Sequence, residues 1–482
     1  MMDIARDILV GLTGAARSLT PVDRRHSFVM RFSIYHRCEN QDFYQSIRTH
    51  FRPSGGTAII NILKCYLIAG AYVSGAVKTF FRNNRAVFIL GFTALLISSV
   101  GDILAGVTLG SMTNTLELLP GLMILIPPAI GMRGNIFGAL GSRLGTSMHV
   151  GTFEHSLRKG SILRQNMEAS LILTMTISFL MGVLAKIVSS ALGVNSISLE
   201  QFIFISVFGG VLAGFVLLVV NVVVANIGFR RNWDIDNISA PLITAAGDIV
   251  TLPMLFLAAI IVLDGKAIIS DLFYELMVVT FLAITVYLVY EALYRRDDES
   301  KRIFVQSAPV LAICTLLDLG AGLTIEDQLV HLVAFPALLV LIPLFLQNCN
   351  ALGGILTSRM SSLLHMGIMS PGKTPGKVGY ENFAIIYIFA LWVFTFVSIA
   401  THFVSLALGL ASPGLLIMIA LGLVAGLITV TVLNFLSYYV AVTTFMFSLD
   451  PDDHSIPVTS SAIDFIGALA LMGVIVAFGL SA

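Results

Sequence analysis

Charged residues are scarce in this chain, and their scarcity excludes an ordinary soluble fold. Only 12% of the 482 residues are Asp, Glu, Lys or Arg, whereas 57% are hydrophobic. A soluble domain carries roughly 25% charged residues, so the composition predicts a multi-pass membrane protein. The formal net charge is zero. No overall field therefore favours nucleic acid or an acidic partner.

Cysteine is also rare, and the few cysteines are scattered. Cys38, Cys65, Cys314 and Cys349 form no CxxC pair, which argues against a disulfide framework and against a zinc site. The first residues lack a short apolar core followed by a small-residue cleavage site. We therefore expect no cleavable signal peptide.

Long apolar runs, by contrast, are abundant from residue 86 onward. A helix needs about 20 mostly apolar residues to cross the hydrocarbon, and the pattern predicts an all-α membrane fold of about eleven spans. These are expected at 86–110, 118–140, 168–193, 202–226, 239–263, 272–294, 303–323, 330–356, 383–408, 412–440 and 457–481. Asn, Gly and Pro interrupt several spans, which is tolerated where backbone faces protein or water.

Basic residues predict the orientation of the spans. They concentrate before the first span and in the connections after the even-numbered spans, whereas Lys266 is the visible exception on the other side. By the positive-inside rule the N-terminus is cytoplasmic and the C-terminus lies outside. The last cytoplasmic loop, "SLDPDDH", is acidic instead of basic.

The segment 1–85 is polar and basic, and it fits either a small cytosolic module or a flexible arm. Within it, the stretch 57–81 is amphipathic, with Lys64 and Lys78, and is expected to lie at the membrane interface. The remaining chain divides into a first repeat at 86–271, a linker helix region at 272–300 and a second repeat at 301–482.

An internal repeat supports this division. Adding 216 to a position in the first half leads to a matching residue in the second half. The matches are Asp102 with Asp318, Pro120 with Pro336, Leu125–Pro127 with Leu341–Pro343, Ser142–Arg143 with Ser358–Arg359, His149 with His365, Asp234 with Asp450, Pro241 with Pro457, and Asp248 with Asp464. One match would be chance, but a constant offset over this length indicates duplication.

Each half holds five predicted spans, and the span 272–294 joins them. Because five plus one is even, both halves enter the membrane in the same direction. The repeats are therefore expected to be parallel and related by a pseudo-twofold axis along the membrane normal. Matching residues on the fifth spans, Asp248 and Asp464, can then face one another across that axis.

Asp248 lies within "SAPLITAAGDIVTLP", a segment that otherwise reads as membrane-spanning. A carboxylate at the centre of a span costs roughly 2.5–3.5 kcal/mol on insertion scales. Thr244 precedes Asp248 by four residues, as Ser460 precedes Asp464, so each hydroxyl shares a helix face with its carboxylate. Such oxygens suit hydrated Mg²⁺. The alternative is an aspartate that caps a broken helix or pairs with a buried basic group.

The second span carries "PPAIGMRGNIFGALGSRL", whose prolines and glycines are expected to break or bend the helix. Asn135 can offer a carbonyl oxygen there. In the second half, "LQNCN" places Asn348 and Asn350 around the matching position. The alternative is helix packing through small residues.

Other acidic residues fall into two groups. Asp102 and Asp318 lie in the first spans of the halves and would line an external vestibule, stabilise a helix break or carry a proton. The second group precedes the fifth spans and consists of Asp234, Asp236, Asp450, Asp452 and Asp453. It would concentrate cations at the inner mouth of a pore, unless it is an ordinary solvated loop. His149 and His365 have no partner at metal-ligand spacing and are expected to be structural.

The pieces "GMRGN", "SRLGTSMHVG" and "DIDNISAPLITAAGDIVTLP" resemble the MgtE family of magnesium channels and transporters, in the two-repeat form that includes eukaryotic solute carriers. The resemblance covers about residues 82–482. It implies a pore on the twofold axis, with Asp248 and Asp464 binding Mg²⁺, the transported ion. The glycine–asparagine feature of the family falls on Gly134 and Asn135, and only loosely on Asn350 because "LQNCN" departs from the motif.

The resemblance also implies a chain that works as a monomer with pseudo-dimeric repeats. Residues 1–85 are too short for the nucleotide-sensing gate of bacterial members. Channel and coupled carrier both stay open, as do another divalent ion and exchange with Na⁺ or H⁺. An intramembrane aspartyl protease is the non-transport alternative, on "AAGD" at 245–248 and "PAL" at 336–338, although the chain has no Tyr-Asp pair.

Overall fold

The computed structural model describes residues 79–480 apart from 83, 155, 157, 159, 232–234, 266–270, 295–297 and 448–455. The chain divides into two units, Met1–Asn84 and Arg85–Ala482, and the helices below belong to the second. They are α4 (Arg85–Ser111), α5 (Thr113–Leu118), α6 (Leu122–Val150), α7 (Ile162–Ala191), α8 (Leu199–Arg231), α9 (Ile235–Gly265), α10 (Asp271–Tyr294), α11 (Asp298–Asp327), α12 (Leu329–Ala334), α13 (Pro336–His365), α14 (Gly376–Ala407), α15 (Leu415–Phe447) and α16 (Ile456–Ala477).

Eleven of the described helices are long and apolar enough to cross a membrane, which confirms the predicted number. The second span differs from the prediction in detail. Its helix, α6, begins at Leu122 and runs without interruption to Val150, through Pro127 and Pro128. An interruption of the helix is therefore wrong, and the bend that was the other expectation stays a prediction. Both prolines fall within the first two turns of α6, where their missing N–H groups free only two nearby carbonyls.

The two halves repeat each other helix by helix. The bounds of the short α5 and α12 are related by the offset that relates the matched residues, and so are those of the long α8 and α15. Packing repeats as well: α7 contacts α8 as α14 contacts α15, and α6 contacts α9 as α13 contacts α16. The pattern of matched residues in the sequence thus corresponds to a duplicated five-helix unit.

The first long helix of each repeat packs against the other repeat. Helix α4 contacts α13, and in the matching way α11 contacts α6. Glycine permits both approaches, because a Cβ at Gly106 would strike the Val340 carbonyl and a Cβ at Gly322 would strike the Ile124 carbonyl. The Ile124 carbonyl also lacks its usual intrahelical donor, since Pro128 has no N–H. These crossings interlock the two repeats.

A matched hydrogen bond joins two helices within each repeat. Arg143 on α6 donates from Nε to Asn166 Oδ1 on α7 at 2.9 Å. Arg359 on α13 donates to Asn382 Oδ1 on α14, also at 2.9 Å. Both asparagines in turn donate to the carbonyl four residues earlier, which holds their amides in place. The motif residues Arg143 and Arg359 therefore join the second and third spans.

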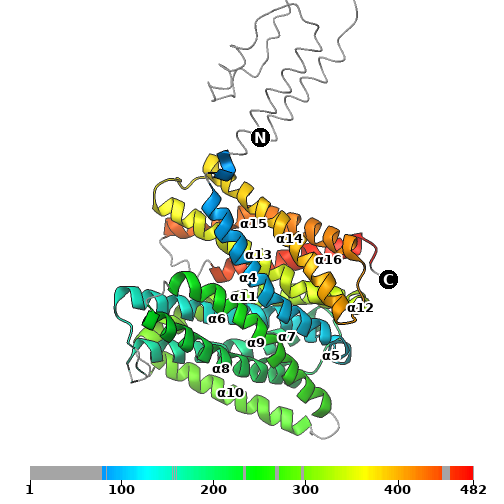
Figure 1. Cartoon of the computed structure of the whole chain (residues 1–482). Helices are drawn as coiled ribbons and strands as arrows, with labels where there is room; N and C mark the ends of the chain where they lie inside the picture. Colours follow the sequence, from blue (N-terminus) through cyan, green and yellow to red (C-terminus); the bar gives the residue numbers. More distant parts are fainter. Residues whose placement is uncertain are drawn as a thin grey trace, which may run out of the picture. The chain divides into compact units, whose positions relative to one another are not determined.

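Helix α10 links the repeats and lies at the edge of the second unit, beside α8 (Figure 1). It packs on α7, α8 and α11. Much of its apolar surface is exposed, including Leu272, Val279 and Val286. Exposed apolar side chains on a spanning helix are those that face lipid. The linker thus lies outside the paired helices that carry the buried polar residues.

Candidate functional site

Among the residues that the structure describes, four aspartates lie buried within the spans. Asp102 on α4 and Asp318 on α11 are 0% exposed, while Asp248 on α9 and Asp464 on α16 are 1% and 5% exposed. Ionisable residues inside a membrane are rare and usually mark an ion path or a proton relay. The four helices that bear them form two matched pairs, because α4 packs on α9 as α11 packs on α16.

The aspartates gather at one place in the unit. The Asp102 carboxyl group lies against that of Asp248 within the first repeat. Asp318 lies within electrostatic range of Asp464 in the second repeat, and Asp464 within range of Asp248 across the repeats. The three roles expected for Asp102 and Asp318, lining an external vestibule, stabilising a helix break or carrying a proton, stay predictions. Both residues adjoin the fifth-span aspartates at the level of the site.

Helix α6 borders the carboxylates of the second repeat through Gly131. A Cβ at this position would lie 2.9 Å from Asp318 Oδ2 and 3.7 Å from Asp464 Oδ2. Only a glycine lets the helix backbone approach the two carboxylates this closely. Gly131 was not predicted as a site residue, although it begins the "GMRGN" motif that drew attention to α6.

Helix α13 contributes two amide side chains that join the repeats. Gln347 Nε2 donates to Asp248 Oδ2. Asn350 Nδ2 donates to Asp464 Oδ1 at 2.9 Å and contacts Gln347 Oε1 at 3.4 Å. A continuous series of hydrogen bonds thus runs from Asp248 through Gln347 and Asn350 to Asp464. The sequence indicated Asn350 but not Gln347.

Several oxygens of the site are buried without a hydrogen-bond partner in the described protein. They are Oδ1 of Asp102, Oδ1 of Asp248, both carboxylate oxygens of Asp318 and Oδ1 of Asn350. A buried polar atom without a partner destabilises the fold unless water or an ion satisfies it. Within the described residues, no three His, Cys, Asp or Glu side chains are close enough to hold a bare metal together. The unpartnered oxygens suit water or a cation that retains water.

Hydroxyl groups also approach the carboxylates. Ser98 Oγ donates to Asp102 Oδ2 at 3.4 Å, and Ser461 lies beside Asp318. The expected hydroxyls were Thr244 and Ser460. Ser460 is half-buried on α16, one turn before Asp464, and the side chain of Thr244 lies outside what the structure describes. Their contact with an ion stays a prediction.

A narrow cavity ends at the site. Its wall consists of three matched pairs from α6 and α13, followed by two polar residues: Ile126 with Ile342, Pro127 with Pro343, Ile130 with Leu346, and then Gln347 and Asp464. The members of each pair occupy equivalent positions in the two repeats. Since matched residues meet at the symmetry axis, this cavity lies on the pseudo-twofold axis, and its wall combines apolar pairs with two polar residues.

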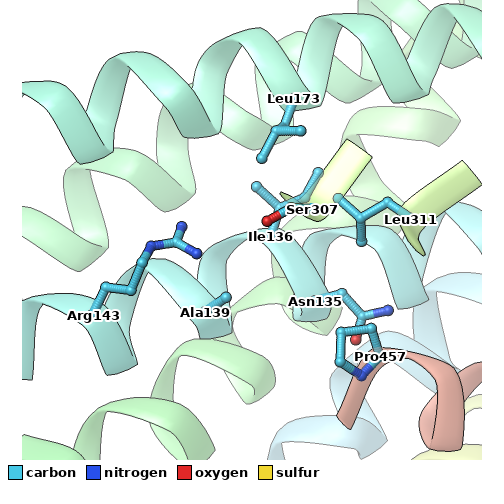
Figure 2. A pocket seen from close by; sticks show the side chains of 8 residues that line it. All are labelled: Asn135, Ile136, Ala139, Arg143, Leu173, Ser307, Leu311 and Pro457. Atoms are coloured by element: carbon cyan, nitrogen blue, oxygen red, sulfur yellow. The ribbon is translucent and has the colours of Figure 1, made fainter. Parts of the chain in front are cut away.

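Asn135 lies in a second cavity, one turn beyond Gly131. Figure 2 shows its amide beside Pro457 of α16, with Arg143 and Ser307 on other sides. Asn135 is 9% exposed, and its Nδ2 has no hydrogen-bond partner in the described protein. Gly134 precedes it on α6 and matches Asn350 in the second repeat. Asn135, on α6 of the first repeat, thus lies beside α16 of the second repeat.

The acidic residues expected at the inner mouth lie mostly outside the described residues. This applies to Asp234, Asp450, Asp452 and Asp453, and to the side chain of Asp236. Most of the segment 1–85 also lies outside the described residues, including nearly all of its amphipathic stretch 57–81. His365 is exposed on α13, where its Nδ1 contacts the Ser361 carbonyl oxygen at 2.8 Å. That contact is compatible with the structural role expected for His365.

Comparison with known proteins identifies the family of the chain. The model of the MgtE family, described as a divalent cation transporter, matches residues 126–258 and 342–474, which are equivalent segments of the two repeats. Solute carrier family 41 member 3 of Mus musculus is 27% identical over 412 residues, covering 80% of this chain and 81% of its own. The Rattus norvegicus protein of that name is 27% identical over 417 residues, covering 78% and 84%.

Solute carrier family 41 member 2 of Homo sapiens is 24% identical over 299 residues, covering 58% of this chain and 49% of its own. No solved structure matches the chain significantly. The family model accounts for both halves and for more than half of all residues, including the helices that bear Asp248 and Asp464. The chain therefore belongs to the MgtE family of divalent cation transporters, a transporter family and not an enzyme family.

Proposed function

We propose that the chain carries Mg²⁺ across the membrane, with Asp248 and Asp464 as its central ion site. The observation that carries this proposal is the proximity of two buried carboxylates, one from each repeat, of which Asp464 lines the axial cavity. Neither repeat alone supplies the site. A single chain with both repeats is then a complete transporter, which works as a monomer.

The donor chemistry favours Mg²⁺. This ion prefers oxygen ligands, demands octahedral geometry and usually keeps several waters, so one or two carboxylates suffice for its site. Here two buried carboxylates lie within electrostatic range of each other, and unpartnered oxygens of Asp102, Asp318 and Asn350 are available to bound water. The carboxylates also remove the charge barrier that a divalent cation would meet inside the hydrocarbon.

The apolar pairs in the wall of the axial cavity support a gated path. Ile126 and Ile342, and likewise Ile130 and Leu346, line the cavity from equivalent positions of the two repeats. Apolar constrictions control ion passage by excluding water. In this proposal the ion passes between these pairs to reach Asp464. The path opens when α6 and α13 move slightly apart.

The orientation follows from the basic connections, with a cytoplasmic N-terminus and an outside C-terminus. The repeats occupy 86–271 and 301–482, the linker region 272–300, and the N-terminal segment 1–85. Asp102 and Asp318 lie in the second layer of the site. Asp234, Asp236, Asp450, Asp452 and Asp453 raise the cation concentration at the inner mouth.

A softer divalent ion is the second candidate, and two cysteines favour it. Cys314 and Cys349 are buried and free, and they lie within electrostatic range of Asp318 and Asp464 respectively. Thiol ligands favour ions such as Zn²⁺. If such an ion is the cargo, replacing both cysteines with Ser will reduce its flux. If Mg²⁺ is the cargo, Mg²⁺ flux in that variant will equal wild type.

The decisive experiment is ion uptake by the full chain in liposomes. Mg²⁺ uptake is measured with competing divalent ions, and with and without Na⁺ and pH gradients, so that exchange is separated from passive flow. Asp248→Asn is expected to abolish uptake and Asp464→Asn to reduce it strongly. Asp264→Asn, an exposed aspartate on the same helix as Asp248, is the matched control. Wild-type uptake in the Asp248 and Asp464 double variant contradicts the proposal.

A further inference from the structure

Gln347 introduces an asymmetry into an otherwise duplicated site. It stands on α13 at the position that Gly131 occupies on α6, and Asn350 stands where α6 has Gly134. The first repeat thus presents bare backbone to the carboxylates of the second. The second repeat instead presents an amide to each fifth-span carboxylate. Both repeats supply an aspartate, but only one supplies side chains from its second span.

The amide group that faces Asp248 is a donor. An ionised carboxylate only accepts hydrogen bonds, so the group that Gln347 turns to Asp248 Oδ2 is its NH₂. An NH₂ group cannot coordinate a cation. A cation that uses Asp248 Oδ2 therefore meets a hydrogen bond already made at that oxygen. The same holds for Asn350 Nδ2 at Asp464 Oδ1.

We propose that Gln347 sets the ion affinity of the site by holding Asp248 in the cation-free protein, as a positioning residue that the ion must displace. This inference rests on the proposed role of Asp248 and Asp464 in ion binding. The series Asp248–Gln347–Asn350–Asp464 keeps both carboxylates in place across the repeats. When the ion binds, the Gln347 side chain rotates, and its NH₂ leaves Asp248.

This role predicts the sign of a variant's effect. Removing the Gln347 amide removes a competitor of the ion, so the apparent KM for Mg²⁺ falls. A charge-assisted hydrogen bond is strong enough to make that fall about tenfold. If Gln347 instead bound the ion through Oε1, its loss would raise the apparent KM. The direction of the change therefore separates the two roles.

The test measures initial Mg²⁺ uptake by the full chain in liposomes against Mg²⁺ concentration. Gln347→Ala removes the side chain, and Gln347→Met removes the donor but keeps nearly the same size. We expect both to lower the apparent KM about tenfold without raising the maximal rate in proportion. A lower KM in Gln347→Ala with a wild-type KM in Gln347→Met assigns Gln347 a packing role and overturns the proposal. An unchanged or raised KM in both also overturns it.

Gln328→Ala is the matched control, because Gln328 Nε2 also donates to an aspartate, Asp327, at 2.8 Å but at the end of α11. Its KM is expected to equal wild type. If a Gln347 variant carries no ion, Mg²⁺-dependent thermal stabilisation measures its affinity directly, with the same expected direction. Wild-type uptake by Asp248→Asn would refute the ion site itself. Loss of uptake in Asp248→Asn with no fall in KM for the Gln347 variants refutes only this inference.

Discussion

Gly131→Ala separates the stability of the fold from the function of the site. A Cβ at Gly131 would lie 2.9 Å from Asp318 Oδ2, about 0.5 Å inside an ordinary contact of about 3.4 Å. The atom that must move, Asp318 Oδ2, lies at the end of a short side chain and is not a backbone atom. Asp318 is thus expected to turn away from α6. This movement changes how its carboxylate lies relative to that of Asp464.

The two effects of this change on stability nearly cancel. Alanine is favoured over glycine inside a helix by roughly 1 kcal/mol, and overpacking costs about 1–3 kcal/mol, at the low end here because the carboxylate can rotate. We expect a thermal midpoint within a few degrees of wild type. Ion binding has no such compensation, and we expect the apparent Mg²⁺ affinity to fall about tenfold, which corresponds to about 1.4 kcal/mol.

The assay is Mg²⁺ uptake in liposomes, with the thermal midpoint measured on the same protein. Gly247→Ala is the control, because Gly247 is adjacent to Asp248 on α9 and a Cβ there meets nothing within 4 Å. Wild-type uptake and affinity in Gly131→Ala would refute the assignment of α6 to the wall of the site. An equal loss in Gly247→Ala would refute the reasoning from distance.

Two further outcomes follow from the fold and the site. Asn382→Ala removes the acceptor of Arg359 and should lower the free energy of unfolding by about 1.5–3 kcal/mol, measured by denaturant titration; no change would show that this bond contributes nothing. Removing Mg²⁺ with a chelator should lower the thermal midpoint of wild type but not of Asp464→Asn, since a ligand stabilises the state that binds it. Equal shifts in both proteins would place the stabilising ion elsewhere.

The number of spans and the duplication were predictable from the sequence. Long apolar runs depend on local composition, and the constant offset between matched residues is a property of the sequence itself. Because five spans and one linker fix parallel repeats, the approach of Asp248 to Asp464 also followed without any structure. The expected proximity agrees with their positions in the fold.

The contact of Asp102 with Asp248 was not predictable. It depends on α4 packing against α9, two helices separated by three long helices in the chain, and helical periodicity says nothing about such packing. The sequence showed a polar residue in the first span and left its place open. Only the fold brings it beside the fifth span.

Gln347 was missed for a different reason. Its partner position in the first repeat is Gly131, so the duplication offered no matching side chain, and the asparagines beside it fitted the expected motif better. The break expected in α6 was wrong because Pro127 and Pro128 stand near the start of a longer helix than predicted. For Asp102 and Gln347 the sequence showed the residue type, and the packing of helices decided which groups each side chain contacts.

The central claim is that Asp248 and Asp464 form one shared ion site, and a double-mutant cycle tests it most directly. Equilibrium Mg²⁺ affinity is measured for wild type, Asp248→Asn, Asp464→Asn and the double variant. Residues at one site are coupled, so we predict that each single change weakens binding strongly and that the double change weakens it little further. Strictly additive losses, or two independent Mg²⁺ sites in wild type, would contradict a shared site.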